Sequence, residues 1–477
     1  MKNKPYNPRT PDPRPQTLDS GHFDKLSDHP LPTPHSLLPF LLLFFLSSLV
    51  MAQTDLEEKR LNTLKYGTET EIAALIQTLK NEGTDSLDNE IIALVENTRN
   101  QKIVGGAFAF FAEREKSGLE TRAIRAIKER DDEGNDTVLA AIDYLGKIKT
   151  AAAAPVFREL LESGEKRYMN AAFRSLGQVG GQNADDTAEY LIDYYENRDA
   201  GDENRRDIIV SIGATGSAKA VPFLAGLASD SETRPVLRMA ALDSIAKIGD
   251  TAGLDAVLLC ISAKDPNIRA TAVAALGPFS GKAVDDAILD AFRDSFYKTR
   301  IAAAQASRQR KLAAAVPYLK FRAENDEVPA VKDEAIRALG AIADRESANT
   351  LEELFTARKN SDRVRIAAGE MIMQNEPERF LDTFIKELDE AKQKNQTALY
   401  NGFLKIIGGT KCSGLEDITR RLMQNSGVIE RSTALDMAAN NRLTALADEM
   451  KTIAGDKNEN LAGKARRTME KLGISNG

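Results

Sequence analysis

Histidine, tryptophan and cysteine are scarce in this 477-residue chain, and their scarcity limits the chemistry that it can carry. There are three histidines, no tryptophan and two cysteines. All three histidines, at His22, His29 and His35, precede a predicted cleavage site, so the processed chain would contain none. Ser–His–Asp and Cys–His catalysis and histidine-ligated metal sites would then be excluded. No P-loop, dinucleotide fingerprint or nucleophile elbow is present either. We therefore expect a protein that is not an enzyme, with no cofactor and no metal.

Basic charge in excess of acidic charge is also missing. The net charge is −7 with a pI near 5.4, which disfavours broad binding to nucleic acid or to anionic membranes. Hydrophobic residues at 42% and charged residues at 28% are typical of a folded soluble protein. These values favour a protein or peptide as partner and argue against nucleic acid.

One long apolar run stands apart from the rest, at Leu37–Val50 ("LLPFLLLFFLSSLV"). It is too short for a comfortable membrane span but suits the apolar core of a signal peptide. The small or apolar groups at Val50 and Ala52 predict cleavage before Gln53. The sequence thus predicts residues 1–52 as a signal peptide and an exported, periplasmic or envelope protein with no stable membrane span. Residues 1–36 are unusually long for the N-terminal region of a signal peptide. The alternatives are a translation start assigned too early, an apolar segment retained as a membrane anchor, or an apolar segment buried in the core.

The stretch "DPNIRATAVAALG", Asp265–Gly277, recurs along residues 53–477. Aligning on its final glycine gives anchors 30 to 36 residues apart, from Gly146 to Gly473, and two fainter ones at Leu79 and Ala112. In each unit the apolar residues follow the 3.6-residue helical period, and many units place a proline at the start of the next helix. An isolated amphipathic hairpin cannot bury its apolar face, so the units must stack on one another.

The Asp–x–x–(Val/Ile)–Arg–x–x–Ala phrase, the Leu–Gly ending and the Ala–Val–Pro start resemble HEAT repeats. The period resembles their short bacterial form, named after phycobilisome lyases. The resemblance implies an all-α fold, an α-α superhelix (solenoid) of about 12 to 13 two-helix repeats. Residues 53–477 would form one such solenoid, with degenerate repeats over 53–135 and clearer ones over 136–477. It also implies that the second helix of each repeat lines the concave surface.

A basic residue recurs in one slot of five successive units, and several of these have an acid in the preceding turn. The functional interpretation is a basic stripe for an acidic ligand. The structural one, which the HEAT resemblance implies, is a ladder of Asp–Arg contacts between turns and helices. Because the charges repeat in register with the core, we favour the ladder. Its predicted members are Asp265, Arg238, Arg269, Arg300, Lys332 and Arg365.

Recognition is better sought at positions that vary between units while sharing one exposed helical face. In the second helix these form a pair spaced i, i+4. Their mixture of signs and apolar neighbours suits a protein or peptide partner, although an ordinary solvated helix face is the alternative. The candidate partner-binding residues are Arg174, Arg206, Asp243, Gln305, Asp333, Arg337, Glu370 and Lys405.

Three other local features have modest interpretations. The basic turn "SRQRKL", Ser307–Leu312, could meet a small anionic partner, but a charged solvated turn is favoured. Cys260 is expected to be a small buried apolar group. It lies four to five repeats from Cys412, too far for a disulfide.

The function predicted from these features is a non-catalytic exported scaffold that binds a protein or peptide on the concave face of the solenoid. Two alternatives remain open. One is a lyase-like enzyme or chaperone acting on bilins, suggested by the repeat subtype. The other is a structural protein of the cell envelope without a discrete partner.

Overall fold

The computed structural model describes residues 55–198 and 201–475, and every regular element within those ranges is helical. The predicted signal peptide 1–52 and its cleavage site before Gln53 lie outside the described residues. Contacts divide the chain into two units, one ending at Glu71 and one beginning at Ile72. In the first, residues 55–66 form a helix.

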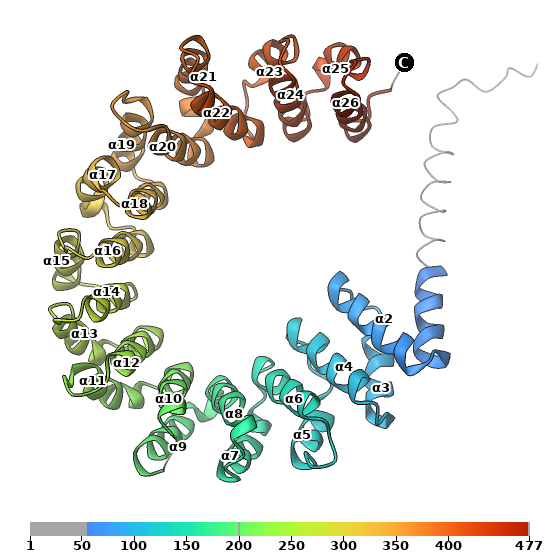
Figure 1. The fold of residues 1–477 in the computed structure, drawn as a ribbon, viewed down its shortest axis with the longest axis vertical. Coiled ribbons are helices and arrows are strands. Elements are labelled where there is room, and N and C mark those ends of the chain that lie inside the picture. Colours follow the sequence, from blue (N-terminus) through green and yellow to red (C-terminus); the bar gives the residue numbers. More distant parts are fainter. Residues whose placement is uncertain (1–54, 199–200, 476–477) are drawn as a thin grey trace, which may run out of the picture. The chain divides into compact units, whose positions relative to one another are not determined.

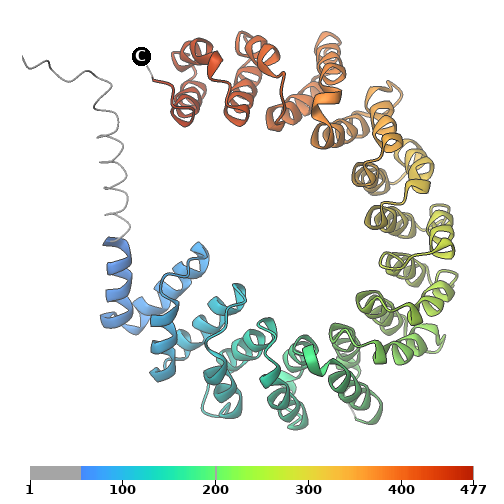
Figure 2. The same cartoon turned by 180° about the vertical axis from the view of Figure 1, so that it is seen from behind.

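In the second unit the helices alternate between two layers (Figure 1 and Figure 2). From α4 onward, each even-numbered helix contacts the next even-numbered helix extensively, while odd-numbered helices contact one another much less. Each odd-numbered helix packs on the even-numbered helix that follows it, as in α11 with α12 and α25 with α26. The all-α solenoid of two-helix repeats is therefore confirmed, with the predicted second helices forming the even layer.

The odd layer consists of α3 (Asp88–Asn97), α5 (Glu120–Lys128), α7 (Ala154–Glu162), α9 (Ala184–Asn197), α11 (Val221–Ser229), α13 (Leu254–Cys260), α15 (Lys282–Ala291), α17 (Val316–Asn325), α19 (Arg345–Thr356), α21 (Pro377–Gln393), α23 (Glu416–Met423) and α25 (Ala447–Ala454). The even layer consists of α2 (Glu69–Glu82), α4 (Gln101–Glu113), α6 (Asn135–Lys147), α8 (Lys166–Gln178), α10 (Asp202–Ala214), α12 (Pro235–Ile248), α14 (Pro266–Ala275), α16 (Tyr297–Arg310), α18 (Pro329–Ile342), α20 (Asp362–Asn375), α22 (Thr397–Gly409), α24 (Val428–Asn441) and α26 (Glu459–Lys471).

Helix ends follow the local signals in the sequence. Pro155, Pro222 and Pro317 each lie in the first turn of an odd-numbered helix, directly after a short 3-10 turn. The first amide groups of a helix have no intrahelical acceptor, so proline loses no bond there. Helix α12 ends at Gly249, whose φ of 71° is in the left-handed region. Glycine reaches that conformation without steric cost, so the helix stops there.

Small residues allow the even-numbered helices to approach closely. A Cβ atom added to Gly177 in α8 would lie 2.4 Å from the carbonyl oxygen of Ser211 in α10. Larger side chains fill the space between layers, as where the rings of Phe355, Phe384 and Phe403 meet with centroids 5.1 to 5.4 Å apart. Among the residues that the structure describes, no helix combines the length and apolar character needed to cross a membrane.

Candidate functional site: a groove across α20, α22 and α24

The recurring basic residue is the fourth residue of an even-numbered helix. Its side chain reaches the edge of the solenoid where turns join the two helices of each repeat, here called the turn edge. Arg269 donates from Nε and Nη2 to both carboxylate oxygens of Asp294, at 2.8 and 3.0 Å. Arg300 bonds Asp326 in the same two-point way, at 2.7 and 2.8 Å. Both arginines also donate Nη1 to two backbone carbonyls of their own turn. These residues hold neighbouring repeats together.

The acid in each of these pairs is not the one that the sequence suggested. Asp265, which precedes Arg269, accepts from the Asn267 backbone N–H at 2.8 Å and caps α14. Asp326, one of two acids in the turn before Lys332, is bonded by Arg300 and not by Lys332. The expected pairing was wrong because the carboxylate of a capping aspartate lies against the first amides of its own helix. The arginine that bonds this carboxylate comes from the preceding repeat.

The remaining slots depart further from an Asp–Arg ladder. Arg238 donates to the Ala228 carbonyl at 2.8 Å, and Lys332 to the Glu324 carbonyl at 2.7 Å. Cys260 is buried as predicted, and its thiol donates to the same Ala228 carbonyl. Both cysteines are free thiols.

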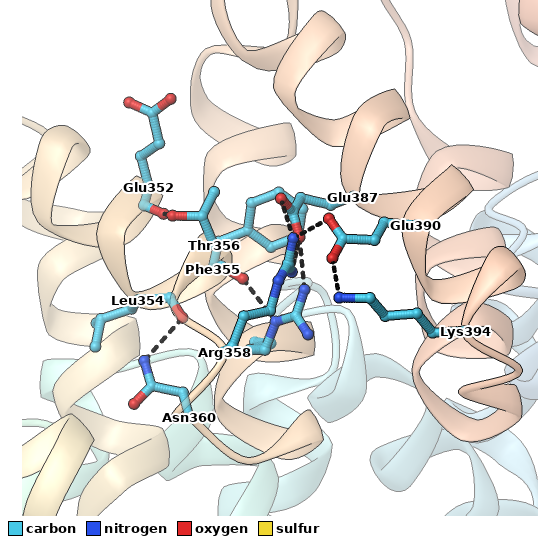
Figure 3. A network of polar contacts seen from close by, with 10 residues as sticks. Glu352, Leu354, Phe355, Thr356, Arg358, Asn360, Glu387, Glu390 and Lys394 are labelled. Atoms are coloured by element: carbon cyan, nitrogen blue, oxygen red, sulfur yellow. Dashed lines mark hydrogen bonds and ion pairs between the residues drawn. The ribbon is translucent and has the colours of Figure 1, made fainter.

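Arg365 bonds Glu387, which also belongs to the network with Arg358, Glu390 and Lys394 that Figure 3 shows. Its Nη2 donates to Glu387 at 2.6 Å and its Nε to the Phe355 carbonyl at 2.9 Å. Arg358 points toward Glu387 and Glu390 and bonds both. Burial, reinforced by the nearby charge of Arg358, lowers the pKa of Arg365. The carboxylate of Glu387, which Arg358 bonds, is buried. Arg358 is thus held by this network and is not free in solvent.

The predicted recognition residues fall on the even layer, and most are open to solvent. Asp333 differs, because it is half-buried and forms an ion pair with Arg363. Arg337 is exposed but bonds the buried Glu334 at 2.8 Å. The exposed members are Arg174, Arg206, Asp243, Gln305, Arg337, Glu370 and Lys405.

Two of these residues, Glu370 and Lys405, line the same hollow. It lies between α20 and α22, has a volume of about 440 Å³, and includes the apolar side chains of Ile366 and Ile406. The helices meet closely at Gly402, where an added Cβ would lie 2.5 Å from Ile366 Cδ1. The remaining predicted residues line none of the hollows described here.

A second hollow of about 380 Å³ continues the first from α22 to α24. The two share Lys405 and Gly409 in their walls. Ile429 lines the second hollow and is one of the large apolar side chains left exposed, at 54%. Together the two hollows form a groove across α20, α22 and α24, here called the even-layer groove.

The charges of this groove contrast with the acidic chain around it. Its first hollow has two exposed lysines, Lys405 and Lys411, and one acid, Glu370. Within the described residues, neither lysine forms a hydrogen bond or ion pair. In the second hollow Asp436 is already paired with Lys464, at 2.6 Å. The groove can thus offer unpaired positive charge beside exposed apolar surface. In the described ranges, no group of three or more His, Cys, Asp or Glu is placed to hold a metal ion.

Comparison with known proteins identifies the repeat. The model of a family described as spirochaete HEAT repeat protein matches residues 64–468. The chain belongs to the spirochaete HEAT repeat protein family. No curated protein matches it.

Solved structures with similar folds include crystal structures of Kap121p alone, bound to Pho4p and bound to Nup53p. Their sequence identities to this HEAT repeat chain are 11%, 10% and 11%, with TM-scores of 0.43, 0.41 and 0.41. The alignments cover 87% of this chain and 53%, 53% and 52% of the Kap121p chain, so this chain spans about half of its length.

Sequence reasoning missed several residues of these HEAT repeats. Arg431 is also the fourth residue of its helix, and it pairs with Asp456 of the next repeat. The repeat alignment placed the anchor of this unit at Ala438, and the slot eight residues earlier is then Glu430, one residue before Arg431. Ile429 and Lys411 were also missed. The adjacent apolar pair that starts α24, Val428 and Ile429, was the available signal.

Proposed function

We propose that this HEAT repeat protein is a non-catalytic, exported scaffold that binds a protein partner through the even layer. The observation that supports it is the even-layer groove, which combines exposed Ile429 with unpaired Lys405 and Lys411. A partner segment with apolar and acidic side chains complements these groups, because burial of apolar surface supplies affinity and opposite charge supplies orientation. The even layer is the face that the HEAT resemblance assigns to the concave side.

Export is the second part of the proposal. It rests on the apolar run Leu37–Val50 and on the small residues before Gln53. N-terminal sequencing of the native protein should then begin at Gln53, and recovery of an intact soluble form would contradict export.

Binding at the groove can be tested with a photo-crosslinking residue introduced at Ile429. Phe321 in α17 is the matched control, because it is 55% exposed and lies in the odd layer. We expect a discrete crosslinked protein from position 429 and none from position 321. Mass spectrometry of the crosslinked segment should identify apolar and acidic residues. Equal crosslinking from both positions would contradict the assignment of binding to the even layer.

Charge reversal provides the second arm of the same experiment. Lys405→Glu with Lys411→Glu should abolish the crosslink from position 429 while leaving the melting temperature nearly unchanged, since exposed substitutions typically cost less than about 0.5 kcal/mol. The control reverses Lys386 in α21 and Lys451 in α25, which are exposed in the odd layer. Arg358 would be an unsuitable control because it bonds buried Glu387. Loss of crosslinking in the control pair alone would place binding on the odd layer.

A further inference from the structure

A second hollow, far along the chain from the even-layer groove, lies at the turn edge of the N-terminal repeats. It has a volume of about 710 Å³. Its walls come from the turn between α3 and α4, from α5, and from the turn between α5 and α6. Almost every lining residue is polar or charged, so the hollow suits a polar ligand and not an apolar side chain.

Arg122 in α5 is the central feature of this hollow. It is only 4% exposed, although it lines the hollow. Its Nη2 donates to Glu133 at 2.7 Å, and the other oxygen of Glu133 accepts from Gln101 Nε2 at 2.6 Å. Gln101 in turn accepts from the Gly134 backbone N–H at 2.8 Å. Three segments of the chain therefore hold the guanidinium in one orientation.

The second terminal nitrogen of Arg122 has no partner. Its Nη1 is buried and forms no hydrogen bond. In Arg300, another buried arginine, Nε, Nη1 and Nη2 all donate to oxygen atoms. A buried donor without an acceptor costs free energy, more so when it is charged. The guanidinium of Arg122 is held rigidly and lines a hollow. A ligand in that hollow that accepts a hydrogen bond from Nη1 would remove this cost.

The surrounding charges restrict what that ligand can be. Arg99 is exposed in the same wall, and its guanidinium forms no hydrogen bond or ion pair among the described residues. Arg125 donates to the backbone carbonyl of Glu96 at 3.3 Å. Opposing them are the exposed carboxylate of Glu96, which forms an ion pair with Arg125, and the exposed carboxylates of Glu129 and Asp132. These acids repel a multiply charged anion, whereas a single carboxylate matches the fork geometry of a guanidinium.

We propose that this hollow binds one carboxylate group, held by Arg122 Nη1 and by Arg99. The carboxylate could belong to the C-terminus of a peptide or to a small organic acid, since both present the same pair of oxygen acceptors. The site is independent of the even-layer groove, so it can stand if that groove binds nothing, and the reverse also holds.

Isothermal titration calorimetry of the full chain with four probes tests the ligand class. Acetyl-Gly-Gly presents a peptide carboxylate, its C-terminal amide removes that charge, butyrate represents a small acid with one carboxylate, and inorganic phosphate represents a multiply charged anion. We expect saturable binding of acetyl-Gly-Gly, of butyrate or of both, with the tighter of the two identifying the source. The amide should not bind. No binding of either carboxylate, or tighter binding of phosphate, would overturn the proposal.

Variants then test the residues. Arg122→Lys keeps the positive charge but removes the guanidinium fork, and should weaken carboxylate binding by about tenfold. Arg99→Gln, at an exposed position, should weaken it without disturbing the fold. Lys128→Gln is the matched control, because Lys128 is an exposed cation of α5 that does not line the hollow. Carboxylate affinity that is unchanged in Arg99→Gln, with thermal unfolding also unchanged, would refute the assignment.

Discussion

In the central repeats the fourth residue of the even-numbered helix is Arg269 or Arg300, and in the N-terminal repeats it is Val104 or Val138. The central arginines cross the turn edge to an aspartate of the next repeat. With valine in the slot no such bond is possible, and the same edge between α3 and α6 contains a hollow lined by charged residues. The two edges thus differ in the pair made by the fourth residue of the even-numbered helix, which is present in the central repeats and absent at the N-terminal edge, where Arg122 and Glu133 pair beside a hollow.

The contrast teaches how a repeat protein can vary function without changing its fold. Both regions stack the same two-helix units, because stacking depends on the apolar faces and the small residues between even-numbered helices. The turn edge lies outside that core. A substitution at the turn edge changes the charge of that edge and how open it is to solvent, while the stacking of the repeats is unchanged.

The largest expected effect comes from breaking the most buried central pair with Arg300→Met. Asp326 is 3% exposed and would remain as a buried carboxylate without its bidentate partner. Removing one partner of such a pair lowers the free energy of unfolding by about 3–5 kcal/mol. Urea unfolding followed by circular dichroism measures this loss.

Two controls sharpen that result. Adding Asp326→Leu to Arg300→Met should recover much of the stability, since no buried charge is then left unpaired. Arg125→Met at the N-terminal edge should cost less than about 1 kcal/mol, because its ion pair with Glu96 is solvent-exposed. Equal losses for Arg300→Met and Arg125→Met would remove the distinction between the two edges.

A smaller effect is expected from Arg269→Ala. Its pair with Asp294 is partly exposed, so loss of these charge-assisted bonds should lower the free energy of unfolding by about 1.5–3 kcal/mol. Crosslinking from Ile429 should be unchanged, because that position lies several repeats away. Unchanged stability with lost crosslinking would instead make the arginine slot a binding feature.

The smallest expected effect is a pH dependence of the same pair. The bond from Arg269 lowers the pKa of Asp294 below its ordinary value of 3.8, although burial opposes this. A lowered folded-state pKa means that the pair contributes its full stability above the ordinary value and loses it as pH falls through the folded-state value. The stability difference between wild type and Asp294→Asn should therefore persist from pH 7 to about pH 5 and shrink below about pH 4.

The N-terminal edge provides the comparison for this pH series. Asp132 is exposed at the rim of the hollow and takes part in no ion pair among the described residues. Asp132→Asn should match wild-type stability at pH 7, where Asp294→Asn is expected to be less stable than wild type. A stability difference for Asp294→Asn that grows toward acid would contradict the assigned sign.

The sequence by itself determined the repeat, the fold class and the slot that carries the arginines. These follow from local rules, since the helical period, the first-turn prolines and the stop at Gly249 act within one unit. It also predicted the exposed face that includes Glu370 and Lys405, because an i, i+4 pair lies on one side of any helix.

Only the tertiary structure decided which acid each arginine binds and where the hollows lie. Asp294 is the partner of Arg269, and Asp265 is not, because the bond crosses to a turn that only stacking brings near. The even-layer groove joins Glu370, Lys405 and Ile429 from three successive repeats, with a close approach at Gly402. The position of Arg122 Nη1, which has no hydrogen-bond partner, likewise depends on bonds that join α5, the start of α4 and the turn before α6. Contacts between repeats depend on the distance and rotation between neighbouring units, which no single repeat encodes.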